Sequence, residues 1–271
     1  MSKIIISSRQ NPLVKFVCGL TEKKKRAEAG AFRFDGVKLL CEILSTDAEI
    51  RYVICRENAD GRVKSVVDAA LETGRLSEEQ VVTVTDEVFD KMSEERSPEG
   101  VITVAPFLCA LHKRDESVPS GKLLVAESLR DPGNLGTVIR TSAALGIDRL
   151  IISDDCADLY NPKTVRAAMG GLFSLHIDVV KSDELPTLIK ALRADGRRIY
   201  ATALNENASL IGELELERGD AFVIGNEGHG LSRATIEAAS GVAIIPMTEE
   251  SESLNAAAAA AICIWETVRV K

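Results

Sequence analysis

The chain has 271 residues, of which 45% are hydrophobic and 27% are charged, and its formal net charge is −8. This composition excludes a disordered chain and predicts a globular protein of two domains, each long enough to bury its own core. The acidic balance argues against a general polyanion binder. No apolar run reaches the ~18 residues of a membrane span and no signal peptide opens the chain, so a cytoplasmic location without membrane association is expected.

The cysteines and histidines predict no metal site. Six cysteines and three histidines are scattered along the chain without a Cys-x-x-Cys pair, whereas a structural zinc site needs four closely grouped ligands. We expect the cysteines to be buried free thiols.

A first domain is expected over residues 1–106, because strand-like runs alternate there with helical patterns in the manner of a small α/β sandwich. The expected helices lie at 11–28, 36–45 and 61–73, and the expected strands lie at 50–56, 80–84 and 100–107. A polar stretch with Pro119 and Gly121 follows, which predicts a linker over residues 107–121.

The start of this domain is basic although the whole chain is acidic. The first 40 residues hold nine Lys and Arg against three Asp and Glu, a local charge of +6. The residues of interest are Arg9, Lys23, Lys24, Lys25 and Arg26. On charge alone, a solvated helix face and a patch that faces phosphate groups explain such a run about equally well.

A second domain is expected over residues 122–271, where short buried strands alternate with helices. The expected strands lie at 122–128, 149–153, 175–179, 197–204, 221–225 and 242–246, and the expected helices at 134–146, 162–170, 183–194, 232–239 and 253–268. This alternation predicts a mostly parallel sheet with helices on both faces. Ligands bind such sheets beyond the carboxyl ends of the strands. The polar and Gly-rich segments 127–136, 204–207, 225–230 and 246–255 would share that edge.

The loop at 225–230 has glycines at 225, 228 and 230. A dinucleotide-binding loop needs Gly-x-Gly-x-x-Gly at the first strand-to-helix turn of its domain, so a nicotinamide site is disfavoured. A plain Gly turn remains an alternative. Glu227 is unusual within such a loop, since its carboxylate could bind a ligand hydroxyl or position a neighbouring arginine.

Two further segments place polar residues at expected helix starts. Asn134 is suited to cap the helix that contains Arg140, and Ser253 or Asn255 can open the last helix. Arg140 lies among apolar residues, so it must reach solvent or find a partner, and either a structural ion pair or a contact with phosphate would satisfy it.

These segments together resemble the SpoU class of the SPOUT RNA methyltransferases. Residues 134–140 match the motif Asn-x-Gly-x-x-x-Arg, and residues 225–230 match Gly-x-Glu-Gly-x-Gly. Ile-Pro-Met at 245–247 followed by Ser-Leu-Asn at 253–255 matches the third motif, and 161–177 resembles the family's Asn-Pro-Lys stretch. The resemblance covers residues 122–271 and includes the order and spacing of the motifs.

The resemblance implies a fold and a cofactor. The second domain would be a SPOUT domain with a C-terminal trefoil knot that binds S-adenosylmethionine (AdoMet). By carry-over, the cofactor-binding residues would be Ala203, Leu204, Gly225, Gly228, Ile245, Met247 and Leu254.

The resemblance also implies methyl transfer to a ribose 2′-hydroxyl of RNA. Arg140 would activate the hydroxyl or stabilise its developing charge, and Glu227 would hold Arg140 or a substrate hydroxyl. Asn134, Ser253 and Asn255 would position ribose and phosphate. Guanidinium is essentially always protonated, so electrostatic stabilisation is physically easier for Arg140 than proton abstraction.

The first domain resembles the ribosomal-protein-like RNA-binding domain that often precedes this catalytic domain, and residues 7–36 carry that likeness. It favours RNA binding for the basic run and ribosomal RNA over transfer RNA as substrate. The family also implies a homodimer. Two alternatives remain, a non-catalytic RNA-binding or ribosome-assembly factor and a nucleotide-dependent dehydrogenase, and the intact motifs and the Gly spacing argue against them.

Overall fold

The computed structural model describes residues 5–95, 97–108, 121–205, 207–248 and 253–270. The chain divides into two compact units, residues 1–108 with 160–173 and residues 109–159 with 174–271. The expected linker at 107–121 lies largely outside the described residues. None of the described helices is long and apolar enough to cross a membrane.

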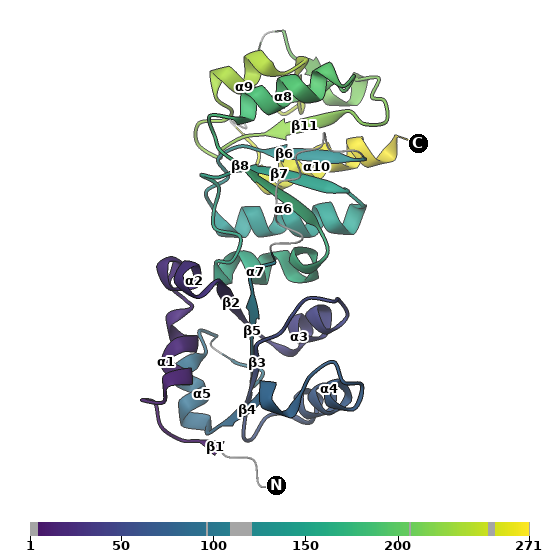
Figure 1. Cartoon of the computed structure of the whole chain (residues 1–271). Coiled ribbons are helices and arrows are strands. Elements are labelled where there is room, and N and C mark those ends of the chain that lie inside the picture. Colours follow the sequence, from purple (N-terminus) through teal and green to yellow (C-terminus); the bar gives the residue numbers. More distant parts are fainter. Residues whose placement is uncertain (1–4, 96, 109–120, 206, 249–252, 271) are drawn as a thin grey trace. The chain divides into compact units, whose positions relative to one another are not determined.

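The first unit is a five-stranded mixed sheet with helices on both faces (Figure 1). The strand order is β1-β4-β3-β5-β2, with β5 antiparallel to both of its neighbours and the other pairs parallel. The strands are β1 (Ile5–Ile6), β2 (Ala31–Asp35), β3 (Tyr52–Arg56), β4 (Val81–Val84) and β5 (Val101–Pro106). Strands and helices thus alternate along this unit.

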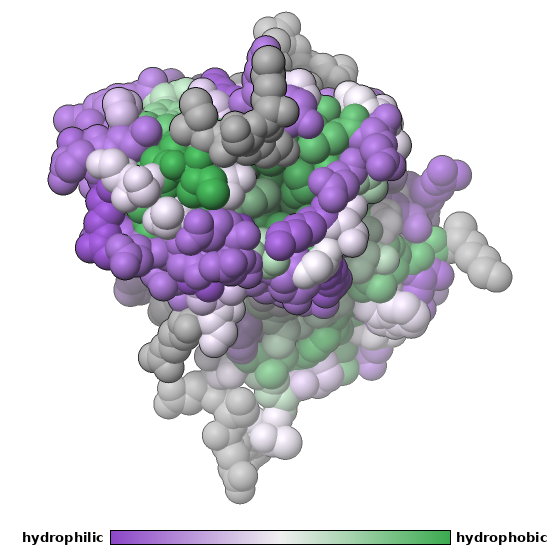
Figure 2. Space-filling model, turned by 90° about the horizontal axis from the view of Figure 1, so that it is seen from below, coloured by the Kyte–Doolittle hydropathy of each residue, from purple (hydrophilic) through white to green (hydrophobic). Residues whose placement is uncertain are grey.

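The helices between β1 and β5 are α1 (Pro12–Gly19), α2 (Lys23–Ala29), α3 (Val37–Leu44), α4 (Gly61–Glu72) and α5 (Asp86–Met92). They bury apolar residues, except α2, whose one buried residue is Arg26. Val14 and Val17 of α1 and Phe89 of α5 pack with strand residues in one core cluster. Figure 2 views the N-terminal side of the chain, where hydrophilic side chains surround apolar areas.

The segment with α7 (Pro162–Ala168) groups with the first unit, although its sequence neighbours belong to the second. The reason is aromatic packing. The Tyr160 ring lies 4.7 Å from that of Phe32, and the Phe173 ring lies 5.3 Å from that of Phe34. Rings at these separations attract each other beyond the effect of area burial.

The second unit contains a seven-stranded parallel sheet in the order β10-β12-β9-β11-β6-β7-β8. The strands are β6 (Leu123–Ala126), β7 (Arg149–Ser153), β8 (His176–Val180), β9 (Ile199–Thr202), β10 (Ser209–Leu210), β11 (Ala221–Ile224) and β12 (Gly241–Ile244). The helices are α6 (Pro132–Leu145), α8 (Leu185–Ala194), α9 (Arg233–Ala238) and α10 (Ala256–Arg269). The expectation of a mostly parallel sheet is confirmed.

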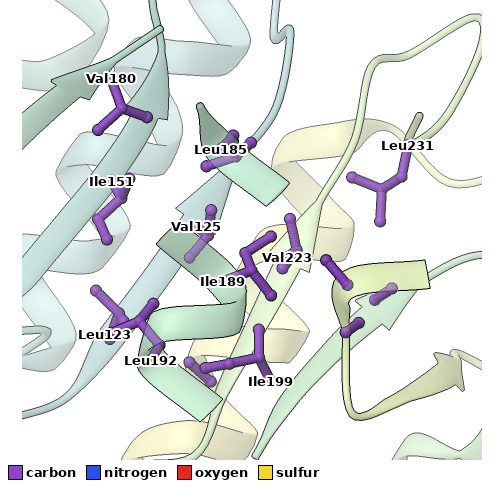
Figure 3. Close-up of a cluster of buried hydrophobic side chains, with 14 residues drawn as sticks. Leu123, Val125, Ile151, Val180, Leu185, Ile189, Leu192, Ile199, Val223 and Leu231 are labelled. Atoms are coloured by element: carbon purple, nitrogen blue, oxygen red, sulfur yellow. The ribbon is translucent and has the colours of Figure 1, made fainter. Parts of the chain in front are cut away.

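Helices cover both faces of this sheet (Figure 1). Helices α8 and α9 contact each other on one face, and α6 and α10 contact each other on the other. Figure 3 shows the core beneath α8, where Ile189 and Leu192 meet Leu123, Val125 and Val223 from the strands. Strands with buried side chains on both faces explain the continuous apolar runs in the sequence.

The cysteines depart from the expectation of buried thiols. Of the five that the structure describes, Cys156 and Cys263 are buried, whereas Cys41 is exposed and Cys18 and Cys55 are partly exposed. Full burial raises the pKa of the Cys263 thiol to about 12, so this side chain stays protonated and acts as an apolar core residue.

Candidate active site

The loops after β6, β9, β11 and β12 meet at one edge of the second sheet. All four strands run in the same direction, because β6 and β9 both pair in parallel with β11, and β12 pairs in parallel with β9. Their carboxyl ends therefore lie together, as the sequence predicted.

Three polar side chains from different segments form a hydrogen-bonded chain at this edge. The amide of Asn255 donates to the Asn134 side-chain oxygen at 3.0 Å. The amide of Asn134 in turn donates to the Glu227 carboxylate at 2.9 Å. The three motif segments of the sequence are thus joined directly through side chains.

Helix caps hold two of these residues in place. Asp131, and not Asn134, caps α6, since its carboxylate accepts from the Asn134 N–H at 2.9 Å. The Asn134 side chain is therefore available for Asn255 and Glu227. Asn255 caps α10 through its side-chain oxygen, which accepts from the N–H groups of Ala257 and Ala258. The cap orients the Asn255 amide toward Asn134.

The loop after β11 is a tight turn built around Asn226. The Asn226 side-chain oxygen accepts from the N–H groups of Gly228 and His229, at 2.8 and 3.1 Å. Its amide donates to the carbonyl of Ser128 at 2.8 Å, which ties the loop to the end of β6. A Cβ atom on Gly225 would lie 2.5 Å from the Gly230 carbonyl carbon, so glycine is needed at this close approach of two backbones.

Two adjoining cavities open on this loop. The larger has a volume of about 570 Å³ and the smaller about 140 Å³, and they share Ala203, Leu204 and Leu254. The larger is also lined by Gly225 and Gly228 and the smaller by Ile245 and Met247. All seven residues expected to bind the cofactor thus lie on these walls. Leu204 and Leu254 are 70% and 38% exposed, so they offer apolar surface.

The expected catalytic residues are not all brought together. Ser253 lines both cavities beside Leu254. Arg140 is exposed and lies about 9 Å further along α6 than Asn134, at 1.5 Å per residue. Within the described part of the chain, Arg140 forms no ion pair, and Glu227 is hydrogen-bonded to Asn134 instead.

The basic run of the first unit divides in two. Arg9, Lys23, Lys24 and Lys25 are exposed. Arg26 is only 2% exposed, and its guanidinium donates to the carbonyl oxygens of Leu20 and Thr21 at 2.9 and 2.7 Å. Arg26 therefore holds α2 onto the preceding turn, which corrects its expected role in RNA binding.

Asn226, which organises the whole loop, was not among the site residues predicted from the sequence. The available signal was an asparagine directly after a strand-ending glycine, a residue that often hydrogen-bonds the backbone two positions on. Among the described residues, no group of three His, Cys, Asp or Glu side chains could hold a metal ion.

Comparison with known proteins identifies the family. Residues 121–265 match the family model described as SpoU rRNA Methylase family, and residues 11–103 match an MRM3-like substrate binding domain. The chain is 32% identical over 261 residues to 23S rRNA (guanosine(2553)-2′-O)-methyltransferase RlmP of Bacillus subtilis, covering 96% of this chain and 97% of the relative. It is 28% identical to 23S rRNA (uridine(2479)-2′-O)-methyltransferase of Streptomyces viridochromogenes, covering 97% of this chain and 91% of the relative.

Solved structures agree with this assignment. The AdoMet-bound rRNA methyltransferase from Sinorhizobium meliloti superposes with a TM-score of 0.82 at 27% identity, covering 98% of this chain and 97% of that one. The chain belongs to the SpoU rRNA methylase family of AdoMet-dependent RNA methyltransferases. The expected enzyme class and cofactor are thereby confirmed, and the dehydrogenase alternative is excluded.

The residues that line the two cavities are suited to bind AdoMet. The two cavities combine apolar side chains, which suit an adenine ring, with exposed main chain around Gly225 and Gly228, which suits polar groups of the ligand. A cavity of about 570 Å³ lies within the usual range for small-molecule sites.

We predict that Gly225→Ala weakens AdoMet binding by about tenfold or more. The new Cβ would lie within 2.8 Å of three backbone atoms of Gly230 and Leu231, so the loop must shift. Overpacking of this kind typically costs ~1–3 kcal/mol. Isothermal titration calorimetry with AdoMet measures the change.

Gly212→Ala is the matched control, because a Cβ at Gly212 meets no atom within 4 Å. It should bind AdoMet as the wild type does. Equal affinity in Gly225→Ala and the wild type would contradict the proposed closeness of this loop to the cofactor.

Proposed function

We propose that this enzyme transfers the methyl group of AdoMet to a ribose 2′-hydroxyl of ribosomal RNA. The observation that carries the proposal is the hydrogen-bonded chain from Asn255 through Asn134 to Glu227, placed beside the cofactor-sized cavity. The relatives named 23S rRNA 2′-O-methyltransferases, which match nearly the whole chain, support the substrate class.

The proposed cofactor-binding residues are those that line the two cavities, namely Ala203, Leu204, Gly225, Gly228, Ile245, Met247 and Leu254. AdoMet, when bound, supplies a methyl group on a positively charged sulfur, which keeps the electron pair of the C–S bond as the new O–C bond forms. The chain's own residues must hold the hydroxyl in line and receive its proton, and such alignment can supply several kcal/mol of the rate enhancement.

Glu227 is the group that we assign to the ribose hydroxyl. Its carboxylate is exposed and is fixed by the amide of Asn134, so it can accept a hydrogen bond from the hydroxyl and pass the proton to water. Asn134 and Asn255 orient that carboxylate and offer further polar contacts to ribose. Ser253, next to the cavity, would contact the adjacent phosphate.

Arg140 is assigned an electrostatic role. It is exposed and unpaired within the described residues, so its charge is available to an RNA phosphate and to the oxygen that becomes negative in the transition state. Guanidinium remains protonated in proteins, which favours stabilisation over proton abstraction.

The proposed division of labour follows the expected domains, 1–106 for RNA binding and 122–271 for methyl transfer. The two matched models, at 11–103 and 121–265, support it. The proposed RNA contacts are Arg9, Lys23, Lys24 and Lys25, all exposed.

We further propose the trefoil knot, the homodimer and the cytoplasmic location that the family implies. For the knot, the supporting feature is α10, which follows β12 and contacts both α6 and β11. For the dimer, it is Trp265 of α10, an aromatic side chain left 56% exposed.

We predict that Arg140→Ala lowers kcat for methyl transfer about 100-fold or more while AdoMet still binds, since loss of one transition-state donor typically costs ~10²–10³ in rate. The measurement is transfer of labelled methyl groups to total RNA from a strain that lacks the protein, with the modified position mapped.

Arg218→Ala, which removes an exposed arginine at the opposite edge of the sheet, serves as control and should retain wild-type rates. Full activity of Arg140→Ala would refute the role of Arg140. Absence of 2′-O-methylation by the wild type on any ribosomal RNA would refute the proposed function.

We also predict that changing Lys23, Lys24 and Lys25 together to Ala weakens RNA binding and flattens its salt dependence. Removing each lysine that binds a phosphate should reduce the slope of log K against log salt concentration by about 1. Filter binding at several salt concentrations measures it. The control changes Lys64, Lys181 and Lys190, which are also exposed, and an equal slope in both triple variants would argue against a specific patch.

A further inference from the structure

A separate pocket of about 280 Å³ lies against the loop after β11 and has no part in the roles assigned so far. Ser128 and Arg130, from the turn after β6, form one side of it. Asn226, His229 and Ser232, from the loop after β11, form the other. Asn226 and His229 also line the cofactor cavity. The loop is therefore a wall that the two spaces share.

The turn on one side of this pocket is held rigidly. Ser128 has φ of +57°, a left-handed conformation that is uncommon for residues other than glycine. Its N–H donates to the Ser153 hydroxyl at 2.8 Å, its hydroxyl to Asp155 at 2.5 Å, and its carbonyl accepts from Asn226 at 2.8 Å. All three polar groups of Ser128 are bonded, so the backbone strain is sustained and the pocket wall is preorganised.

Glu127 lines the pocket, and its carboxylate is already engaged in hydrogen bonds within the protein. Glu127 is 5% exposed, and its carboxylate accepts from the N–H and hydroxyl of Ser232 and from the hydroxyl of Thr235, at 2.8–2.9 Å. Glu127 is therefore largely occupied, and the exposed Arg130 and His229 are left to contact a ligand.

Two planar groups stand at the rim, Arg130 and His229. The Arg130 side chain is 71% exposed, and it meets Asp155 only at 3.5 Å. Burial disfavours the charge on Asp155, but hydrogen bonds from serine side chains and from Arg130 outweigh this and keep the Asp155 pKa below its ordinary value. His229 is exposed in the turn that Asn226 fixes. Because its contact with Asp155 is long, the Arg130 side chain is weakly restrained and can contact a ligand.

The chemistry of the rim suits an unpaired nucleobase. Protein recognition of single-stranded RNA stacks splayed bases on aromatic rings, including histidine, and on guanidinium planes. In a nucleotide the base is attached to C1′, the direct neighbour of the C2′ that bears the reacting hydroxyl. A ribose whose 2′-hydroxyl faces Glu227 thus presents its base to the residues beside Glu227.

We propose that this pocket receives the nucleobase of the target nucleotide, held against Arg130 and His229. The proposal rests on the function proposed above and adds to it a determinant of substrate choice. A base held on one side of the loop would fix the hydroxyl relative to the cofactor cavity on the other side.

The test compares two synthetic ribosomal RNA fragments that contain the mapped target nucleotide. One carries the normal base, and the other has hydrogen in place of the base while it keeps the 2′-hydroxyl. We expect the wild type to prefer the intact fragment by about tenfold or more in kcat/KM, because base stacking on protein side chains is worth ~1–3 kcal/mol. In the double variant Arg130→Ala with His229→Ala, this preference should fall toward one.

Arg233→Ala, a charge-matched change at an exposed residue next to Ser232 that does not line the pocket, should keep the wild-type preference. Because Arg130 and His229 are both exposed, the melting temperature of the double variant, measured by circular dichroism, should match that of the wild type, which verifies its fold. Equal use of both fragments by the wild type, or an undiminished preference in the double variant, would overturn the base pocket alone. Failure of the wild type on both fragments would refute the proposed function and the pocket with it.

Discussion

The hydrogen-bonded chain from Asn255 through Asn134 to Glu227 is the contact on which the site depends. It connects residues 121 and 93 positions apart in the sequence. The parallel sheet brings these segments to one edge, and the three side chains join the segments to each other. The Asn134 amide uses both of its polar ends, since its oxygen accepts from Asn255 and its nitrogen donates to Glu227.

The same residues also complete the fold. Asn255 caps the last helix with the oxygen of the side chain whose nitrogen bonds Asn134. Asn226 organises the loop after β11 and ties it to Ser128. Capping and site assembly are thus performed by single side chains, so a site residue cannot move without disturbing a helix or a turn. Rigid support of this kind preorganises a reaction site.

The sequence predicted the features that arise from local pattern. Short apolar strands between helices predicted the parallel sheet, and the glycine spacing argued against a dinucleotide site. Motif resemblance brought Asn134, Glu227 and Asn255 into one hypothesis. The sequence did not predict the hydrogen-bond partners of these residues. Asp131 caps α6 in place of Asn134, and Glu227 is hydrogen-bonded to Asn134 and not to the expected arginine.

Tertiary packing explains the remaining differences. Charge counting treats Lys25 and Arg26 alike, although the structure exposes one and buries the other among carbonyl oxygens. The segment around α7 joins the first unit through aromatic contacts between residues more than a hundred positions apart, which no local pattern contains. The strained conformation of Ser128 could not be predicted from the sequence either, because it depends on hydrogen bonds with Ser153, Asp155 and Asn226.

The most direct test of this account is a double-mutant cycle on kcat/KM with Asn134→Ala and Asn255→Ala. If the two side chains act as one hydrogen-bonded unit, the double variant should be hardly slower than the more damaged single variant, with a coupling of ~1 kcal/mol or more. Reductions in rate that simply multiply would mean that the residues act independently, and would contradict the central place given to their hydrogen bond.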